Sequence, residues 1–166
     1  MASPAAVMAI VTAVAGGEPG ARASPSLTRA PGGSGWRSVA SVIATLAEVS
    51  LDSADPEALI GFYQRVLGGE VDVVSADFVV LRLAGIAVTS SRVADYRRPT
   101  WPHSTVPKQV HLDLRVGSLD AAELALVAAG AHRADHQPHP DQYRVFLDPA
   151  GHPFCACLPA DWVARP

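Results

Sequence analysis

The sequence is poor in positive charge and has no long apolar run. Its 166 residues include 13 Lys and Arg against 16 Asp and Glu, and the pI is about 6.0. Proteins that bind nucleic acid usually carry a basic patch or stripe, so this balance argues against a nucleic-acid partner. No stretch approaches the roughly 20 apolar residues that span a membrane, and we expect no membrane partner.

Cysteine is also scarce, since the sequence contains only Cys155 and Cys157. Two residues apart on a predicted strand, they share a face in a geometry that is poor for a bond between them. We therefore predict two reduced thiols and a cytoplasmic protein.

The first 42 residues lack the hydrophobic period of a folded segment. They are rich in Ala, Gly, Pro and Ser, a composition that cannot bury enough apolar surface to become ordered. The apolar stretch 5–15 resembles a signal-peptide core, but the positively charged N-terminal flank is missing. We predict a disordered leader over 1–42, or a start codon assigned too early, followed by one domain over 43–161.

The first half of this domain predicts one strand, one helix and three strands. Residues 48–52 alternate, with Glu48, Ser50 and Asp52 on one face and apolar residues on the other. Asp55-Pro56 predicts a helix start, and Gly68-Gly69 predicts its end. The predicted strands that complete module one (43–92) are 70–74, 77–83 and 86–92.

The second half repeats this order after a proline-rich connector, 93–108. Residues 109–116 alternate again, with His111, Asp113 and Arg115 on the polar face. Ser118 predicts the cap of a helix that Gly130 ends. The predicted strands that complete module two (109–158) are about 131–136, 142–148 and 153–158.

A turn motif, Asp-Pro-Ala-Gly-His-Pro-Phe at 148–154, lies between the last two predicted strands. A weaker copy lies 66 positions upstream, where residues 79–85 match 145–151. The repeated hairpin supports a duplication of one βαβββ module.

These residues resemble the vicinal oxygen chelate superfamily, the glyoxalase, bleomycin-resistance and extradiol-dioxygenase group, and above all its glyoxalase-like branch. The matching segments are 48–63, 99–102, 111–116 and 148–155. The resemblance implies an α+β fold, with two βαβββ modules forming a curled mixed sheet around a cleft that binds a small molecule. By the same analogy, a homodimer is plausible.

In its metal-dependent members the group binds one divalent ion, which stabilises charge on a substrate oxygen. Carried onto this sequence, the ligand positions fall on Glu48, Ser91, His111 and Cys155, with Thr89 replacing Ser91 if the hairpins match residue for residue. The enzymes of the group usually carry His or Gln on first strands and Glu on last strands, so this set departs from the pattern. We expect the usual metal site to be missing, and zinc to be the ion if one binds, because zinc accepts Glu, His and Cys.

The polar faces of the two first strands supply the remaining site candidates. If they line a cleft, His111 and Glu48 are the catalytic candidates, with His111 as base. Arg115 would grip an anionic group, and Asp113 and Ser50 would contact the substrate. The alternative is a solvated sheet face held by ion pairs.

Three other features each have a functional and a structural interpretation. Cys155 is a nucleophile if His111 lowers its pKa, or else a small buried residue. Trp101 is an aromatic wall over a planar ligand, or else an apolar plug for the connector. Three histidines among glycine and prolines are predicted to be surface residues: His132, His136 and His139.

Two classes of function follow. One is a lyase or dioxygenase-type enzyme that uses Glu48, His111 and Cys155, with zinc. The other is a binding protein that sequesters a small molecule, as the resistance proteins of the group do.

Overall fold

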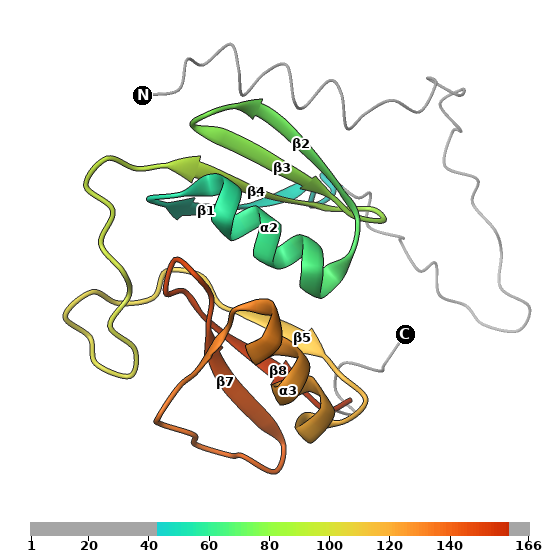
Figure 1. Cartoon of the computed structure of the whole chain (residues 1–166), viewed down its shortest axis with the longest axis vertical. Coiled ribbons are helices and arrows are strands. Elements are labelled where there is room, and N and C mark those ends of the chain that lie inside the picture. Colours follow the sequence, from blue (N-terminus) through green and yellow to red (C-terminus); the bar gives the residue numbers. More distant parts are fainter. Residues whose placement is uncertain (1–42, 160–166) are drawn as a thin grey trace, which may run out of the picture. The chain divides into compact units, whose positions relative to one another are not determined.

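The computed structural model describes residues 43–159 (Figure 1). The chain divides into two units, Met1–Ala47 and Glu48–Pro166, and every helix and strand below belongs to the second. The predicted leader and the predicted domain end at residue 161 lie outside the described residues. None of the helices in 43–159 is long and apolar enough to cross a membrane.

Module one forms a four-stranded mixed sheet with one helix. Its strands lie in the order β1-β4-β3-β2, with β1 parallel to β4 and the other pairs antiparallel. Its elements are β1 (Glu48–Ser53), α2 (Pro56–Leu67), β2 (Glu70–Ser75), β3 (Phe78–Arg82) and β4 (Ala87–Arg92).

Helix α2 begins where the sequence predicts. The Asp55 carboxylate accepts a hydrogen bond from the Ala58 N–H at 3.1 Å, and Pro56 occupies the first turn. Leu59 and Phe62, one turn apart, are fully buried, and they hold the helix on its sheet through apolar burial.

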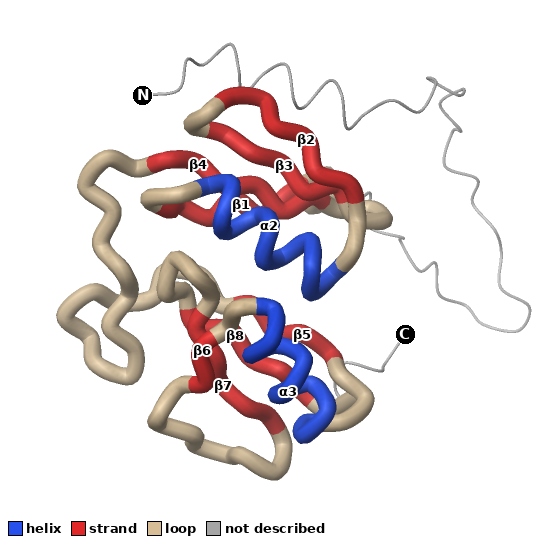
Figure 2. Tube along the Cα trace, viewed as in Figure 1, coloured by secondary structure: helices blue, strands red, loops and turns tan. Residues whose placement is uncertain are grey.

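Module two repeats this arrangement, with its strands in the order β5-β8-β7-β6 (Figure 2). Ser118 caps α3, and Gly130 ends it in the left-handed conformation, both as predicted. Its elements are β5 (Leu112–Arg115), α3 (Leu119–Ala129), β6 (His132–Arg133), β7 (Tyr143–Leu147) and β8 (Pro153–Cys157).

Strand β6 is shorter than the predicted span, 131–136. The side chain of Gln137 accepts from the Val145 N–H at 2.9 Å and donates to the Val145 carbonyl oxygen at 2.8 Å. The Ala134 N–H donates to the same Val145 carbonyl oxygen at 3.0 Å, so the Val145 N–H is the β7 group that a longer strand would pair with and that Gln137 binds instead. A side-chain amide therefore takes the place of a strand, which periodicity cannot reveal.

The predicted α+β fold with two βαβββ modules is confirmed. The strands form two four-stranded sheets, one in each module. Their registers also correspond, since Ser50 lies opposite Thr89 in module one and Asp113 lies opposite Cys155 in module two. Thr89, rather than Ser91, is thus the counterpart of Cys155.

The modules share one apolar core along α2 and β8. The rings of Phe62 and Phe154 lie 5.8 Å apart between centroids, and both side chains are fully buried. Tyr63 donates a hydrogen bond to Asp148 at 3.0 Å. The shared core fixes module two, which carries the candidate site, against the helix of module one.

Candidate functional site

A cavity of about 1130 Å³ opens on the second sheet. The strand residues that line this cavity alternate with strand residues that face α3 in the core, such as Phe154 and Ala156. The cavity therefore lies on the sheet face opposite that helix. The lining comprises Trp101, Lys108, His111, Asp113, Arg115, Pro138, Asp141, Gln142, Tyr143, Val145, Cys155, Cys157, Leu158 and Pro159.

Strand alternation brings four chemically active side chains to this face. His111 immediately precedes β5, and Asp113 lies two residues further on. Cys155 and Cys157 are likewise two apart on β8. Because Asp113 is paired with Cys155 in the parallel ladder, the two short segments meet side by side.

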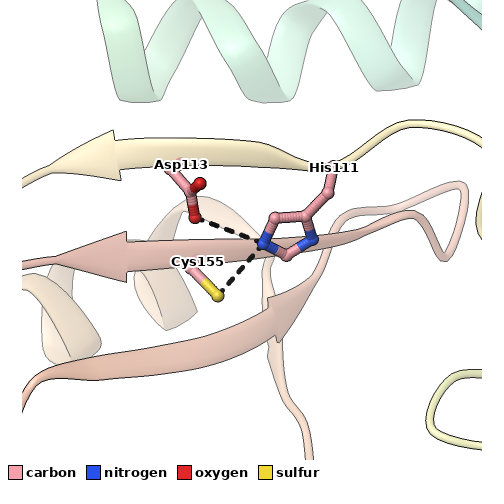
Figure 3. Close-up of side chains that lie close together, drawn as sticks. All are labelled: His111, Asp113 and Cys155. Atoms are coloured by element: carbon pink, nitrogen blue, oxygen red, sulfur yellow. Dashed lines mark hydrogen bonds and ion pairs between the residues drawn. The ribbon is translucent and has the colours of Figure 1, made fainter.

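The imidazole of His111 is the centre of this group (Figure 3). Its Nε2 atom lies 3.2 Å from Cys155 Sγ and 3.3 Å from Asp113 Oδ1. Cys157 Sγ donates to the same Asp113 oxygen at 3.5 Å. On the other side of the ring, Lys108 Nζ lies 3.5 Å from His111 Nδ1.

The electrostatics keep the imidazole neutral and the thiols protonated. Burial, and then the Lys108 ammonium, lower the pKa of His111. Burial, and then the Asp113 carboxylate, raise the pKa of Cys155 to about 11 and that of Cys157 to about 12. The site without a bound cation is therefore a weakly nucleophilic dithiol.

A nucleophile assisted by a His–Asp pair needs the thiol and the carboxylate on opposite ring nitrogens. Here Cys155 and Asp113 both approach Nε2. Together with the raised thiol pKa, this geometry disfavours the nucleophile interpretation of Cys155, which is also buried.

Trp101 lines the cavity and also packs on a small buried cluster of Ala134, Val145 and Cys155. Its ring lies 5.4 Å from that of His136 between centroids. It therefore anchors the connector on module two, while the aromatic wall over a planar ligand stays a prediction. Arg115 also lines the cavity.

The structure separates the other predicted site residues from this group. Glu48 and Ser50 lie on β1, and Ser91 lies on β4, all in the first sheet. None of the three lines the cavity. The family-type set of Glu48, Ser91, His111 and Cys155 is thus divided between the two sheets, as ligands drawn from both modules would be, and its binding of one ion stays a prediction. Among the described residues, Glu48 does not belong to the group around His111.

Sequence reasoning did not single out Lys108 and Cys157. Cys157 could have been found from alternation, because it shares the strand face of Cys155. Lys108 belongs to the connector, which has no periodic sequence pattern from which the direction of a side chain could be predicted. The three predicted surface histidines, His132, His136 and His139, are all exposed, as expected.

His152, in the repeated turn, is half-buried and makes two contacts outside the turn. Its Nε2 lies 2.7 Å from the Asp52 carbonyl oxygen and 3.1 Å from the Tyr96 hydroxyl. It therefore ties the turn to β1 and the connector.

Comparison with known proteins matches the model of the glyoxalase-like domain over residues 48–157. A search of the curated proteins finds no match. Among solved structures, a glyoxalase/bleomycin resistance protein/dioxygenase family enzyme from Burkholderia phytofirmans PsJN is 21% identical, with a TM-score of 0.53. That alignment covers 69% of this chain and 98% of that one.

Two further structures show the same fold at low identity. The genomically encoded fosfomycin resistance protein FosX from Listeria monocytogenes is 16% identical, with a TM-score of 0.55, and covers 73% of this chain and 98% of its own. A glyoxalase-related enzyme from Fulvimarina pelagi is 20% identical, with a TM-score of 0.52, and covers 70% and 89%. With its duplicated βαβββ modules and the match over 48–157, the chain belongs to the glyoxalase-like domain family of the vicinal oxygen chelate superfamily.

Proposed function

We propose that this chain binds a small organic molecule that has a flat apolar part and an anionic group, in the cavity of module two. The observation that carries the proposal is the composition of the cavity. Aromatic and aliphatic walls surround a few polar groups, and this is typical of small-molecule sites.

The apolar part of the ligand would lie against Trp101 and Tyr143. Both side chains are half-buried, so each keeps a free surface toward the cavity while its other side packs on Val145 or its neighbours. Stacking on such rings favours a planar ligand.

The anionic group would be held by Lys108 and Arg115. Neither side chain forms an ion pair with another residue in the described part of the chain, so both remain available to a ligand. A guanidinium grips a carboxylate or phosphate with two hydrogen bonds.

A thermal-shift screen of the full chain tests this proposal, with catechols, adducts of dicarbonyls with thiols, and glycopeptides as probes. We expect at least one class to raise the melting temperature, and Arg115→Ala and Trp101→Ala to weaken that effect about tenfold or more in apparent Kd. Arg97→Ala is the matched control, because Arg97 is an exposed connector arginine outside the cavity lining. Equal losses in all three variants would contradict the assignment.

A second candidate function is catalysis of the lyase or dioxygenase type, with His111 as base. It is supported by the neutral state of His111, since a lowered pKa leaves the imidazole able to accept a proton. Any ligand found in the screen should then be turned over, and His111→Ala should abolish turnover while binding persists. A stabilising ligand without turnover would leave sequestration as the function.

We also propose that the chain forms a homodimer and works in the cytoplasm. The cavity lining comes from module two, the connector and the residues after β8, with no residue of module one, and in a dimer a second copy would cover it. Light scattering during size-exclusion chromatography should give twice the mass of the 17.3 kDa chain, and a monomer would contradict this. The two free thiols support a reducing compartment.

A further inference from the structure

We propose that module two alone binds one zinc ion through His111, Asp113, Cys155 and Cys157. This inference goes beyond small-molecule binding. It also departs from the family-type ligand set, because it uses Asp113 and Cys157 in place of residues from module one.

The first argument is convergence on one point. Ligand atoms of His111, Asp113 and Cys155 all lie within 4.8 Å of one another. Zinc bond lengths of about 2.0–2.3 Å place tetrahedral ligand atoms about 3.3–3.8 Å apart. The separations from His111 Nε2, 3.2 Å to Cys155 Sγ and 3.3 Å to Asp113 Oδ1, are close to these edges.

The fourth ligand, Cys157, lies beside one of the other three, Asp113. Cys157 Sγ is 3.5 Å from Asp113 Oδ1, which is again close to a tetrahedral edge. The backbone supplies two ligands from each of two paired segments, with a spacing of two residues that keeps both side chains on the cavity face. Closing the site requires the Cys157 side chain to turn its Sγ atom from Asp113 toward the point on which the other three converge.

The donor chemistry selects the ion. Two thiolates and an imidazole favour zinc over Mg²⁺ and Mn²⁺, which need oxygen ligands. Zinc and the Lys108 ammonium, 3.5 Å from the His111 ring, would together offset the charges of the carboxylate and the two thiolates. The Asp113 side chain is 60% exposed and lines the cavity, so a ligand in the cavity could displace it from the ion.

The test uses the full chain, freed of metal with a chelator and then titrated with Co²⁺ as a spectroscopic substitute for zinc. We expect one Co²⁺ per chain, displaceable by one Zn²⁺, with tetrahedral visible bands and a near-ultraviolet band from sulfur-to-cobalt charge transfer. Cys155→Ser and Cys157→Ser should each remove about half of the charge-transfer intensity, since each supplies one of two thiolates, and weaken binding about tenfold or more. Asp113→Asn should weaken binding while the charge-transfer band persists.

Glu48→Gln is the matched control, because Glu48 occupies the first-strand position of module one. It should leave the affinity and the spectrum unchanged. Loss of binding in Glu48→Gln with normal binding in Cys157→Ser would overturn the proposal in favour of a family-type site. Failure of the unmodified chain to bind Co²⁺ or Zn²⁺ would also overturn it.

Circular dichroism of each metal-free variant checks that it folds. If the buried Cys155→Ser variant does not fold, Cys157→Ser and Asp113→Asn decide the outcome, because their side chains are less buried. The small-molecule screen is run separately on metal-free protein, so failure of the zinc site and failure of the proposed function are distinguishable.

Discussion

Asp148 joins the two modules through one buried carboxylate. Only 4% exposed, it accepts hydrogen bonds from the Tyr63 hydroxyl at 3.0 Å and from the N–H groups of Ala150 and His152 at 2.9 Å. The two backbone bonds shape the turn, and the bond to Tyr63 reaches α2 of module one. Asp148, which the sequence pattern assigns to a turn, therefore also links the two modules by a hydrogen bond.

Tyr63→Phe should lower the free energy of unfolding by about 1–3 kcal/mol, because it leaves a buried carboxylate without one of its donors. Urea denaturation at pH 7 measures this change. Tyr96→Phe is the comparison, since the Tyr96 hydroxyl donates to the Ala150 carbonyl in a half-buried position, and its loss should cost less. An equal or larger cost for Tyr96→Phe would contradict the central role of Asp148.

Asp148 should also make stability depend on pH. Burial raises its pKa above the ordinary value of 3.8, against the opposing effects of nearby His152 and of the hydrogen bonds. Because the pKa of Asp148 is higher in the folded than in the unfolded chain, its protonation stabilises the folded state. This stabilisation is fully present below about pH 4 and is lost as pH rises through the folded pKa.

The measurement compares the unfolding free energies of the unmodified chain and Asp148→Asn from about pH 4 to pH 8. As pH rises, the unfolding free energy of the unmodified chain should fall relative to that of Asp148→Asn, and the difference should then level off. A shift in the opposite direction would mean that the hydrogen bonds outweigh burial and lower the pKa.

At the scale of elements, the two repeated hairpins differ in how tightly their turns are packed. Gly85 and Gly151 occupy equivalent positions and both have positive φ angles, 82° and 90°. A Cβ atom at Gly85 would meet nothing within 4 Å, whereas one at Gly151 would lie 3.1–3.2 Å from the Arg98 side chain. The module-two turn is therefore in close contact with the connector.

Gly85→Ala should cost about 1–2 kcal/mol, because alanine is strained in the left-handed region. Gly151→Ala should cost about 1 kcal/mol more, because the methyl group must also displace Arg98. Denaturant midpoints of the two variants measure the difference. Arg98→Ala combined with Gly151→Ala should bring the cost close to that of Gly85→Ala, and no such recovery would refute the packing argument.

At the scale of the whole molecule, the shared core of the two modules predicts a single unfolding transition for the structured domain. Core residues of both modules, Phe62 and Phe154 among them, form one buried cluster, and Arg65 of α2 donates to the Ala129 carbonyl at the end of α3. If one module unfolded alone, the part of this cluster that belongs to the other module would be exposed to solvent.

Urea unfolding followed by far-ultraviolet circular dichroism and by tryptophan fluorescence tests this cooperativity. With Trp36 and Trp162 replaced by Phe, fluorescence reports on Trp101 beside module two. The two curves should have the same midpoint. Separate midpoints would show that the modules unfold independently.

Local patterns were sufficient for most of the fold. Caps such as Asp55 and Ser118, and glycine stops such as Gly130, act within a few residues of where they lie, so the helix ends were predicted from the sequence. The predicted limits of β6 were wrong because the Gln137 side chain, and not a continued strand, binds the Val145 N–H of β7. No local sequence pattern encodes this contact.

The candidate site divides in the same way between sequence and structure. Alternation placed His111, Asp113 and Arg115 on one face, because the side chains of a strand point alternately to its two sides. The duplicated modules, the family and the cavity-facing position of Cys155 were likewise determined by the sequence. Tertiary structure alone decided that Asp113 and Cys155 meet at one nitrogen of His111 and that Glu48 lies on another sheet. The physical reason is that strand pairing between distant segments sets these distances, whereas a periodic pattern fixes only direction.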